Sequence, residues 1–281
     1  MSDGIGAERA RVVAQALAED LGGRGDITSE LIIPADLTAT AQVVSRESGV
    51  LAGRGAGEEV LRQTGLRGVW HRADGDRLTP GAVVADISGP ARALLTAERT
   101  LLNLLCHLSG IASLTAVYAE AAAPARVLDT RKTTPGLRLL EKAAVAAGGG
   151  DNHRSGLYDR VLVKDNHLAL AGAGLGDAVA RARRDLPGVL VEVEADDLAG
   201  VHRALDAGAD WILLDNMSPE RLREAVTTVA GRALLEASGG MTLDGARAAA
   251  ACGVDAVSVG ALTHSAPALD LGLDIAVPPA R

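Results

Sequence analysis

The strongest constraint on the fold is a regular alternation of short β-rich runs and helical stretches from about residue 124 onward. The β-rich runs lie at 126–129, 160–164, 189–194, 211–215, 233–237 and 255–260, and helical stretches at 136–147, 168–185, 196–207, 218–230 and 242–252 separate them. Strand and helix repeated in this order predict a parallel sheet. No dinucleotide fingerprint accompanies the units, so the pattern favours a closed or nearly closed TIM-like barrel of about six parallel strands over an open doubly wound sheet.

The first third of the chain follows a different pattern. Residues 5–20 carry apolar positions at helical spacing, and 25–29 have the composition of a turn. Residues 38–90 alternate apolar and polar side chains between turn signals, which predicts an antiparallel sheet with hairpins. Residues 91–123 return to a helical pattern.

Composition and charge exclude several classes of protein. The chain has 281 residues and is 48% hydrophobic, which is enough for a packed core, and its net charge of −8 argues against a general nucleic-acid or membrane-surface binder. Cys106 and Cys252 lie far apart in apolar helical patterns, which predicts buried free thiols and a cytoplasmic location. The N-terminal residues contain no signal-peptide pattern. Residues 100–119 lack formal charge, but polar side chains interrupt them, so we expect a buried helix and no membrane span.

Every predicted strand of the second part ends in polar residues or glycine. The loops after parallel strands converge on one mouth of a barrel, where active sites lie. Cations at this mouth, in a chain that is acidic overall, indicate a bound anion. The residues in question are Asp129, Arg131 and Lys132, then His153 and Arg154, and then Lys164, Glu194, Asp215, Ser238 to Gly240 and Gly260 with Ala261.

Alternatives stay open for the single residues. Strand parity places Glu192 and Glu194 on the inner face, but a strand-end carboxylate can equally form a buried salt bridge or cap a helix. Asp215 could cap the helix that follows it, Lys164 could pair with one of the acids, and His167 could simply start a helix. Arg131, Lys132 and Arg154 could each be solvated surface residues, and His153 could be an ordinary surface or hydrogen-bonded histidine.

Two glycine turns indicate a phosphate site. Ser238 to Gly240 and Gly260 with Ala261 each stand between a strand and a helix, where backbone N–H groups can hold a phosphate, although glycine is also common there for backbone reasons. Together these features predict a phosphorylated sugar bearing pyrophosphate beside an acidic co-substrate.

Ordered motifs over nearly the whole chain resemble one enzyme family, quinolinate phosphoribosyltransferase. One departure is Ala237, where the family pattern has a second Ser. The motifs that carry the resemblance are Asp129-Thr-Arg-Lys-Thr-Thr-Pro-Gly136, Gly148-Gly-Gly-Asp-Asn-His-Arg154, Lys164-Asp-Asn-His167, Glu192-Val-Glu194, Leu214-Asp-Asn216, Glu236-Ala-Ser-Gly-Gly240 and Val259-Gly-Ala-Leu-Thr-His264, with Glu98-Arg99-Thr-Leu-Leu-Asn103 in the first third.

The resemblance implies an activity and an architecture. The reaction converts quinolinate and phosphoribosyl pyrophosphate to nicotinate mononucleotide, pyrophosphate and CO2, with Mg²⁺, in de novo NAD synthesis in the cytoplasm. The architecture has an N-terminal α/β sandwich at 1–110, on which the C-terminal tail 266–281 packs, and a barrel at 111–265. A homodimer is implied in which Arg99 enters the site of the partner.

The resemblance also implies roles for residues. Lys132, Glu194 and Asp215 would be catalytic, and Glu194 and Asp215 would also face the metal. The implied substrate-binding residues are Arg99, Thr130, Arg131, Lys132, His153, Arg154, Lys164, Glu194, Asp215, Ser238, Gly239, Gly240, Val259, Gly260 and Ala261.

Two other functions compete with this one. A relative on the same fold, such as those associated with molybdenum transport, would act on another acid, and the complete Arg131-Lys132 and His153-Arg154 pairs favour quinolinate over that alternative. A non-catalytic binding protein would keep Ser238 to Gly240 but could lose Lys132 or the acids, which are all present.

Overall fold

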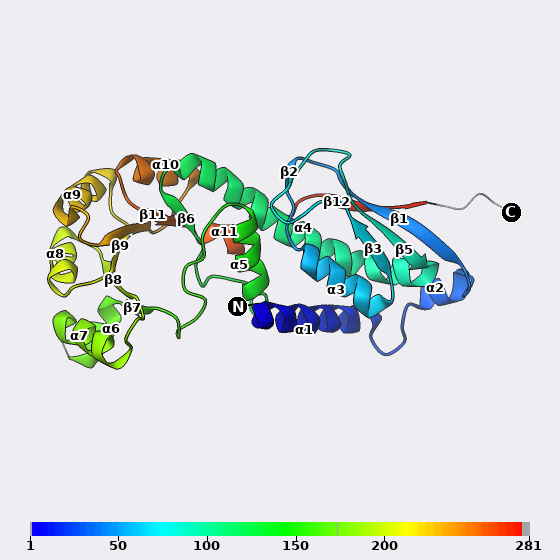
Figure 1. Cartoon of the computed structure of the whole chain (residues 1–281), viewed down its shortest axis with the longest axis horizontal. Helices are drawn as coiled ribbons and strands as arrows, with labels where there is room; N and C mark the ends of the chain where they lie inside the picture. Colours follow the sequence, from blue (N-terminus) through cyan, green and yellow to red (C-terminus); the bar gives the residue numbers. More distant parts are fainter. Residues whose placement is uncertain (1, 173, 277–281) are drawn as a thin grey trace. The chain divides into compact units, whose positions relative to one another are not determined.

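The computed structural model (Figure 1) describes residues 2–172 and 174–276, and the chain forms two compact units. The first unit contains the residues up to 116, residues 133–149 and those from 265 onward, and the second contains 117–132 and 150–264. Helix α4 (Ala91–Ala122) begins in the first unit and ends in the second. The boundary at residue 110 that the resemblance implied therefore falls inside a helix.

The first unit is built on the antiparallel sheet that the sequence predicted. Its strands are β1 (Thr38–Ser45), β3 (Arg67–Trp70), β5 (Val83–Pro90) and β12 (Leu271–Ala276), in the order β12-β1-β5-β3. A separate hydrogen-bonded pair joins β2 (Gly49–Val50) and β4 (Arg77–Leu78). Strand β12 belongs to the C-terminal tail, of which residues 277–281 lie outside the described part of the chain.

Two helices of the first unit were not predicted. After α1 (Ser2–Leu21), helix α2 (Ile27–Ile32) occupies the place of the predicted turn, because the Asp26 side chain accepts the Ser29 N–H at 2.9 Å and caps it. Helix α3 (Arg54–Thr64) interrupts the predicted run of hairpins. Gly57 lets α3 approach closely, since a Cβ there would lie 2.6 Å from the Trp70 ring.

Helix α4 is the buried helix that the sequence predicted. It is long and apolar enough to cross a membrane by length and composition, but 56% of its apolar window is buried within the protein. Leu101, Leu105, Leu108 and Ile111 are at most 2% exposed. Such burial is typical of the core helix of a globular protein.

Helix α5 (Arg138–Ala147) belongs to the first unit and carries a buried carboxylate. The Glu141 side chain is fully buried, and its Oε1 lies 2.9 Å from His107 Nε2. Its Oε2 accepts the Thr134 N–H at 3.1 Å. This carboxylate therefore fixes the backbone of Thr134, two residues after Lys132.

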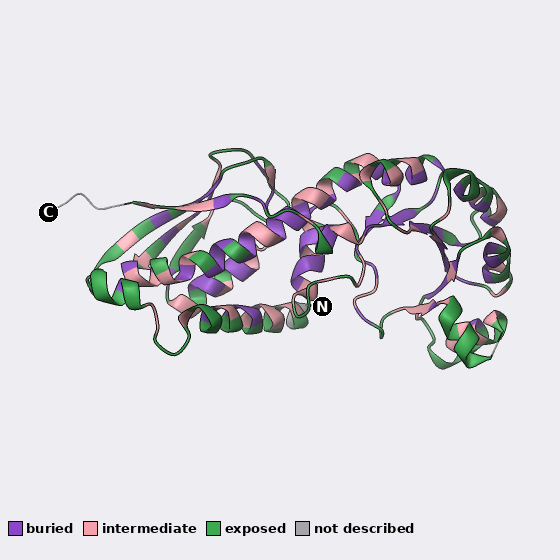
Figure 2. Ribbon diagram, turned by 180° about the vertical axis from the view of Figure 1, so that it is seen from behind, coloured by how far each residue is buried: buried purple, intermediate pink, exposed green. Residues whose placement is uncertain are grey.

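The second unit contains the six parallel strands that the sequence predicted. They are β6 (Arg126–Leu128), β7 (Val161–Val163), β8 (Val191–Ala195), β9 (Trp211–Asp215), β10 (Leu234–Ser238) and β11 (Ala256–Ser258), in the order β6-β11-β10-β9-β8-β7. The strands are mostly buried, and the exposed faces of the helices point away from them (Figure 2). The helices are α6 (Asp165–Ala171), α7 (Leu175–Asp185), α8 (Leu198–Asp206), α9 (Pro219–Val229), α10 (Leu243–Ala251) and α11 (Ala261–His264).

One helix boundary differs from the prediction. The single helix expected at 168–185 is two helices, because Gly172 adopts a left-handed φ of 60° and ends α6. Helix α7 then begins at Leu175.

Backbone hydrogen bonds between the described strands do not close the barrel. Its strand order is that of a barrel opened between β6 and β7, and within the described residues no ladder joins those two strands. Only a single parallel bridge, between Leu128 and Asp151, extends β6 toward the gap. All six carboxyl ends lie at one edge, as in every parallel sheet, and there the loops gather.

Candidate functional site

A cavity of about 650 Å³ opens at the carboxyl ends of these strands. All the predicted site residues of the second unit except Val259 line it. Val259 directly precedes the lining residue Gly260 and is fully buried. Arg99 lies on α4 in the first unit, and its predicted role concerns a partner chain. The lining consists of Thr130, Arg131, Lys132, His153, Arg154, Leu162, Lys164, Glu194, Leu213, Asp215, Asn216, Glu236, Ser238, Gly239, Gly240, Met241, Ser258, Gly260, Ala261 and His264.

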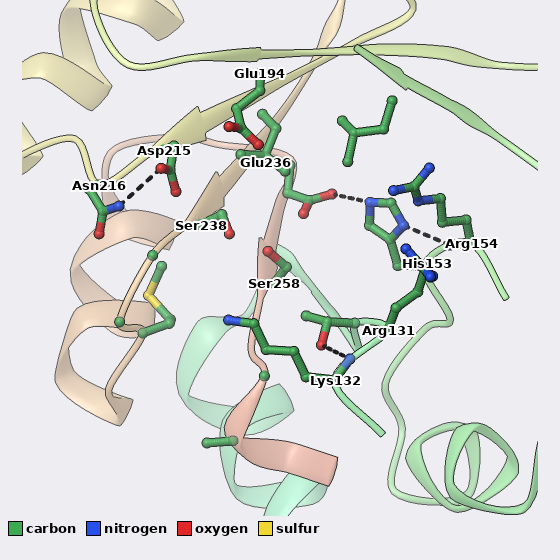
Figure 3. Close-up of a pocket in the computed structure, with 18 of the residues that line it drawn as sticks. Arg131, Lys132, His153, Arg154, Glu194, Asp215, Asn216, Glu236, Ser238 and Ser258 are labelled. Atoms are coloured by element: carbon green, nitrogen blue, oxygen red, sulfur yellow. Dashed lines mark hydrogen bonds and ion pairs between the residues drawn. The ribbon is translucent and has the colours of Figure 1, made fainter. Parts of the chain in front are cut away.

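Two strand-end carboxylates and two arginines lie on different sides of the cavity. In Figure 3, Glu194 and Asp215 lie on one side and Arg131 and Arg154 on the other, with Glu236 between them. A ligand that spans the cavity would therefore meet carboxylates at one end and guanidinium groups at the other.

The loop after β6 holds Lys132 in a fixed backbone position. The Lys132 N–H donates to Thr130 Oγ1 at 3.0 Å, and the Thr263 hydroxyl donates to the Lys132 carbonyl at 2.7 Å. Gly260 leaves room for the lysine side chain, because a Cβ at Gly260 would lie 3.0 Å from Lys132 Cδ. The ammonium group is thus positioned by backbone and packing contacts.

The two strand-end acids, Glu194 and Asp215, have different partners in the cavity. Glu194 Oε2 pairs with Lys164 Nζ, the ion pair that was one alternative for this lysine. Asp215 Oδ2 accepts a hydrogen bond from Asn216 Nδ2 at 3.0 Å. Ser218 caps α9 in place of Asp215, so the Asp215 carboxylate faces the cavity.

The turn after β10 requires glycine. Gly239 has a φ of 107°, and a Cβ there would lie 2.2 Å from Asn216 Oδ1. Gly240 follows with a φ of 48°. Successive residues without side chains expose backbone N–H groups at the cavity wall, the arrangement that suits an anion.

His153 lies at the centre of a buried charged cluster that also contains Glu192, Glu236 and Arg160. His153 Nε2 is 3.0 Å from Glu192 Oε2 and 3.4 Å from Glu236 Oε2, and Arg160 Nη1 donates to Glu192 Oε2 at 3.3 Å. The Arg154 N–H donates to His153 Nδ1 at 2.7 Å. Both ring nitrogens are therefore engaged by protein atoms.

The protonation states of this cluster follow from burial and neighbours. Burial lowers the pKa of His153, but hydrogen bonds to Glu192 and Glu236 outweigh it and raise the pKa to about 9. The raised pKa favours a charged ring, whereas the Arg154 N–H, 2.7 Å from Nδ1, requires a lone pair on that nitrogen. Because the contact is short and direct, we assign the neutral ring with its proton on Nε2. Burial raises the pKa of Glu236, whereas hydrogen bonds from His153 outweigh burial and lower the pKa of Glu192.

The cations on the cavity wall crowd one another. Burial and the neighbouring Arg131 both lower the pKa of Arg154. A guanidinium keeps its charge under such conditions, so this wall carries two forked cationic groups of the kind that bind carboxylate or phosphate oxygens.

The sequence analysis missed some residues of the cavity. Glu236 was quoted within a motif but not assigned to the site, although it precedes Ser238 by two residues and so shares its face of β10. The same parity relates Ser258 to Gly260. Asn216 and His264 lack such a signal, because their place depends on turns.

Comparisons with known proteins agree with these motifs. The family models of quinolinate phosphoribosyl transferase match over residues 26–109 for the N-terminal domain and 111–274 for the C-terminal domain. The chain is 44% identical over 272 residues to nicotinate-nucleotide pyrophosphorylase (carboxylating) of Mycobacterium leprae, covering 94% of this chain and 95% of that one. It is 42% identical over 262 residues to the probable enzyme of the same name of Bacillus subtilis, covering 92% and 90%.

A solved structure is similar over the same extent. The nicotinate-nucleotide pyrophosphorylase from Francisella tularensis superimposes with a TM-score of 0.91 at 37% identity, covering 96% of this chain and 97% of that chain. The chain belongs to the quinolinate phosphoribosyltransferase family.

Proposed function

We propose that this protein is a carboxylating nicotinate-nucleotide pyrophosphorylase. It joins quinolinate to phosphoribosyl pyrophosphate and releases nicotinate mononucleotide, pyrophosphate and CO2, a step of de novo NAD synthesis. The observation that carries the proposal is that Arg131, Lys132, Arg154 and Lys164 line one cavity in a chain of net charge −8. Curated relatives of about the same length carry this name.

The two ends of the cavity suit the two substrates. Arg131 and Arg154 stand together, and planar forked donors bind carboxylates bidentately, which fits the dicarboxylate quinolinate. The turn at Ser238 to Gly240 offers backbone N–H groups for the 5′-phosphate of the sugar. The ribose then lies between them, near Glu194 and Asp215.

The side chains between the two ends fit the bond changes. When the bond from the anomeric carbon to pyrophosphate breaks, positive charge develops on the sugar ring, and the Glu194 and Asp215 carboxylates stabilise it. Lys132 and Lys164 offset the negative charge of the departing pyrophosphate. The pyridine nitrogen of quinolinate supplies the electron pair for the new bond to the anomeric carbon.

Decarboxylation follows from the product of that step. The pyridinium ring withdraws electrons, so the bond between C2 and its carboxylate breaks, the electron pair stays on C2 and CO2 leaves. C2 then takes a proton. The proton donor is water or Lys132.

A magnesium ion is part of the proposal. Glu194 and Asp215 end neighbouring strands and offer hard carboxylate oxygens to the cavity, and Mg²⁺ is commonly held by one or two carboxylates together with substrate phosphates. The donor set therefore fits the ion. When bound, Mg²⁺ would neutralise charge on the pyrophosphate group.

We also propose a cytoplasmic homodimer in which Arg99 of one chain enters the cavity of its partner. This assembly is supported by the Glu98-Arg99 motif, which the resemblance assigns to a shared site. A mixture of Arg99→Ala and Lys132→Ala chains would then regain activity, because some mixed dimers contain one site with both residues intact. Failure of stable mixed dimers to recover turnover would contradict the shared site.

The activity is tested by incubating the purified protein with quinolinate, phosphoribosyl pyrophosphate and Mg²⁺ and following nicotinate mononucleotide by mass spectrometry. Product formation with quinolinate and none with nicotinate is expected, because nicotinate lacks the second carboxylate. No product, or equal turnover with nicotinate, would refute the proposed function.

A further inference from the structure

Within the described residues, backbone hydrogen bonds extend the sheet into the gap between β6 and β7 from the β6 side only. Residue 151 lies beside β6 as a parallel bridge partner of Leu128, since the Asp151 N–H donates to the Val127 carbonyl at 2.8 Å and the Asp129 N–H donates to the Asp151 carbonyl at 3.2 Å. The His153 N–H then donates to Asp129 Oδ1 at 2.9 Å. On the other side β7 pairs with β8 and, within the described residues, with no other strand.

The Glu192 carboxylate joins the two sides of this gap. Glu192 lies in β8 with its side chain fully buried on the inner face. Its Oε2 is 3.0 Å from Nε2 of His153, which follows the β6 side, and it accepts Arg160 Nη1, which precedes β7, at 3.3 Å. Side chains therefore close the barrel where backbone hydrogen bonds do not.

The same cluster holds Arg154 at the cavity wall. The Arg154 N–H donates to His153 Nδ1, and Arg154 Nη1 donates to the Arg160 carbonyl at 3.4 Å. Both partners of Arg154 are thus residues that Glu192 holds. The Arg160 guanidinium also stacks on Trp211, with its central carbon 5.2 Å from the ring centroid, which fixes its own position.

We propose that Glu192 is a positioning residue that closes the gap between β6 and β7 through His153 and Arg160 and thereby orients Arg154 toward the acidic co-substrate. The kinetic part of this inference rests on the proposed function. Burying a carboxylate is costly unless it is paired and hydrogen-bonded, and Glu192 is paired on both sides of the gap. Glu192 acts through Arg154 and does not itself contact the substrates.

A metal ion is the competing occupant of this cluster. The ligand atoms of His153, Glu192 and Glu236 lie within 4.8 Å of one another, a set that could hold a metal ion. Arg160 already supplies a positive charge to Glu192 Oε2, which makes a second cation unnecessary. The metal content of the purified protein therefore distinguishes the two assignments.

The test compares Glu192→Gln with Val193→Ala, a buried position of the same strand on the opposite face. The first measurement is hydrogen exchange of the amides at 151–160, which needs no turnover. We expect faster exchange of this segment in Glu192→Gln and not in Val193→Ala. Unchanged exchange at 151–160 in Glu192→Gln would overturn the inference whether or not the protein has the proposed activity.

The second measurement is kinetic. Loss of the charged partner is expected to raise the KM for quinolinate about tenfold in Glu192→Gln, while the KM for phosphoribosyl pyrophosphate changes less than about twofold. In an Arg154→Ala background the same substitution should add less than about twofold, because its effect passes through Arg154.

Three results would contradict this account. Equal rises in both KM values would indicate general damage to the site, and full additivity with Arg154→Ala would mean that Glu192 acts elsewhere. One equivalent of metal in the purified wild-type protein, lost in Glu192→Gln, would make the cluster a metal site. Wild-type protein without turnover would refute the proposed function, and the exchange experiment would still decide the role of Glu192.

Discussion

Gly260 is predicted to act as a spacer for Lys132, and Gly260→Ala tests this. Its backbone φ lies outside the left-handed region, so alanine can adopt the conformation. The added methyl group would lie 3.0 Å from Lys132 Cδ and 3.1 Å from His264 Nε2, contacts that are a few tenths of an ångström too close. Both are far ends of flexible side chains, which can shift.

The two consequences differ in size. Alanine restricts the unfolded chain and so contributes about 0.4–1 kcal/mol of stability, which offsets part of the crowding, and the free energy of unfolding should change by less than about 1 kcal/mol. Activity is more sensitive, because a misplacement approaching 1 Å costs roughly 100-fold. For a smaller shift of the Lys132 ammonium we expect kcat to fall about 10-fold to 100-fold, or about 1.4–2.7 kcal/mol.

Steady-state formation of nicotinate mononucleotide and a thermal melt together check the prediction. Gly260 also lies in the proposed phosphate-binding turn, and a blocked phosphate would raise the KM for phosphoribosyl pyrophosphate instead of lowering kcat. A double-mutant cycle with Lys132→Ala separates the two, because Gly260→Ala should cost little once the lysine side chain is gone. A kcat within twofold of wild type, or full additivity in the cycle, would refute the spacer role.

Three further predictions concern buried or cavity-lining acids. Burial raises the pKa of Glu236, so the folded state binds its proton more tightly than the unfolded state. The stability of the folded state therefore falls as the pH rises above the ordinary pKa of a carboxyl group. In urea unfolding at pH 5 and pH 8, the free energy of unfolding of Glu236→Gln relative to wild type should therefore increase with pH. Glu141→Leu leaves the Thr134 N–H and His107 without their partner and should lower the free energy of unfolding by about 1–3 kcal/mol, measured by chemical unfolding. Glu141→Gln can still accept the hydrogen bond from Thr134 and should retain most of the stability. Removal of Mg²⁺ by EDTA should abolish turnover, and added Mg²⁺ should restore turnover. Glu194→Gln should need roughly tenfold more Mg²⁺ for half-maximal rate. Activity that EDTA does not change would contradict the metal proposal.

The parallel sheet could be predicted from sequence because its signal is local. Each buried strand is a short β-rich run bounded by helical periodicity, and all six strands lie within the predicted runs or within one residue of them. Helix α3 was missed since two of its first four residues, Gly55 and Gly57, are glycines, which usually mark turns. In the structure Gly57 makes room for Trp70, a packing contact that no local pattern reveals.

The candidate site was predictable to the extent that it depends on strand ends. Arg131, Lys132, Glu194 and Asp215 follow directly from where the strands stop. The bond from Glu192 to His153 joins residues 39 positions apart across a gap in the barrel, so only the folded chain reveals it. Parity did place Glu192 on the inner face, but parity cannot name the partner.

The buried acids explain how the cavity can hold several cations before any substrate arrives. Burial lowers the pKa of Arg154, and Arg131 and Arg160, which each repel Arg154, lower its pKa further. Glu192 is fully buried inside the barrel, pairs with Arg160 and attracts Arg154. Glu192 thus offsets part of the repulsion among the cations from inside the barrel. An anionic ligand therefore meets donors that are already held in place, and little of its binding energy is needed to gather them.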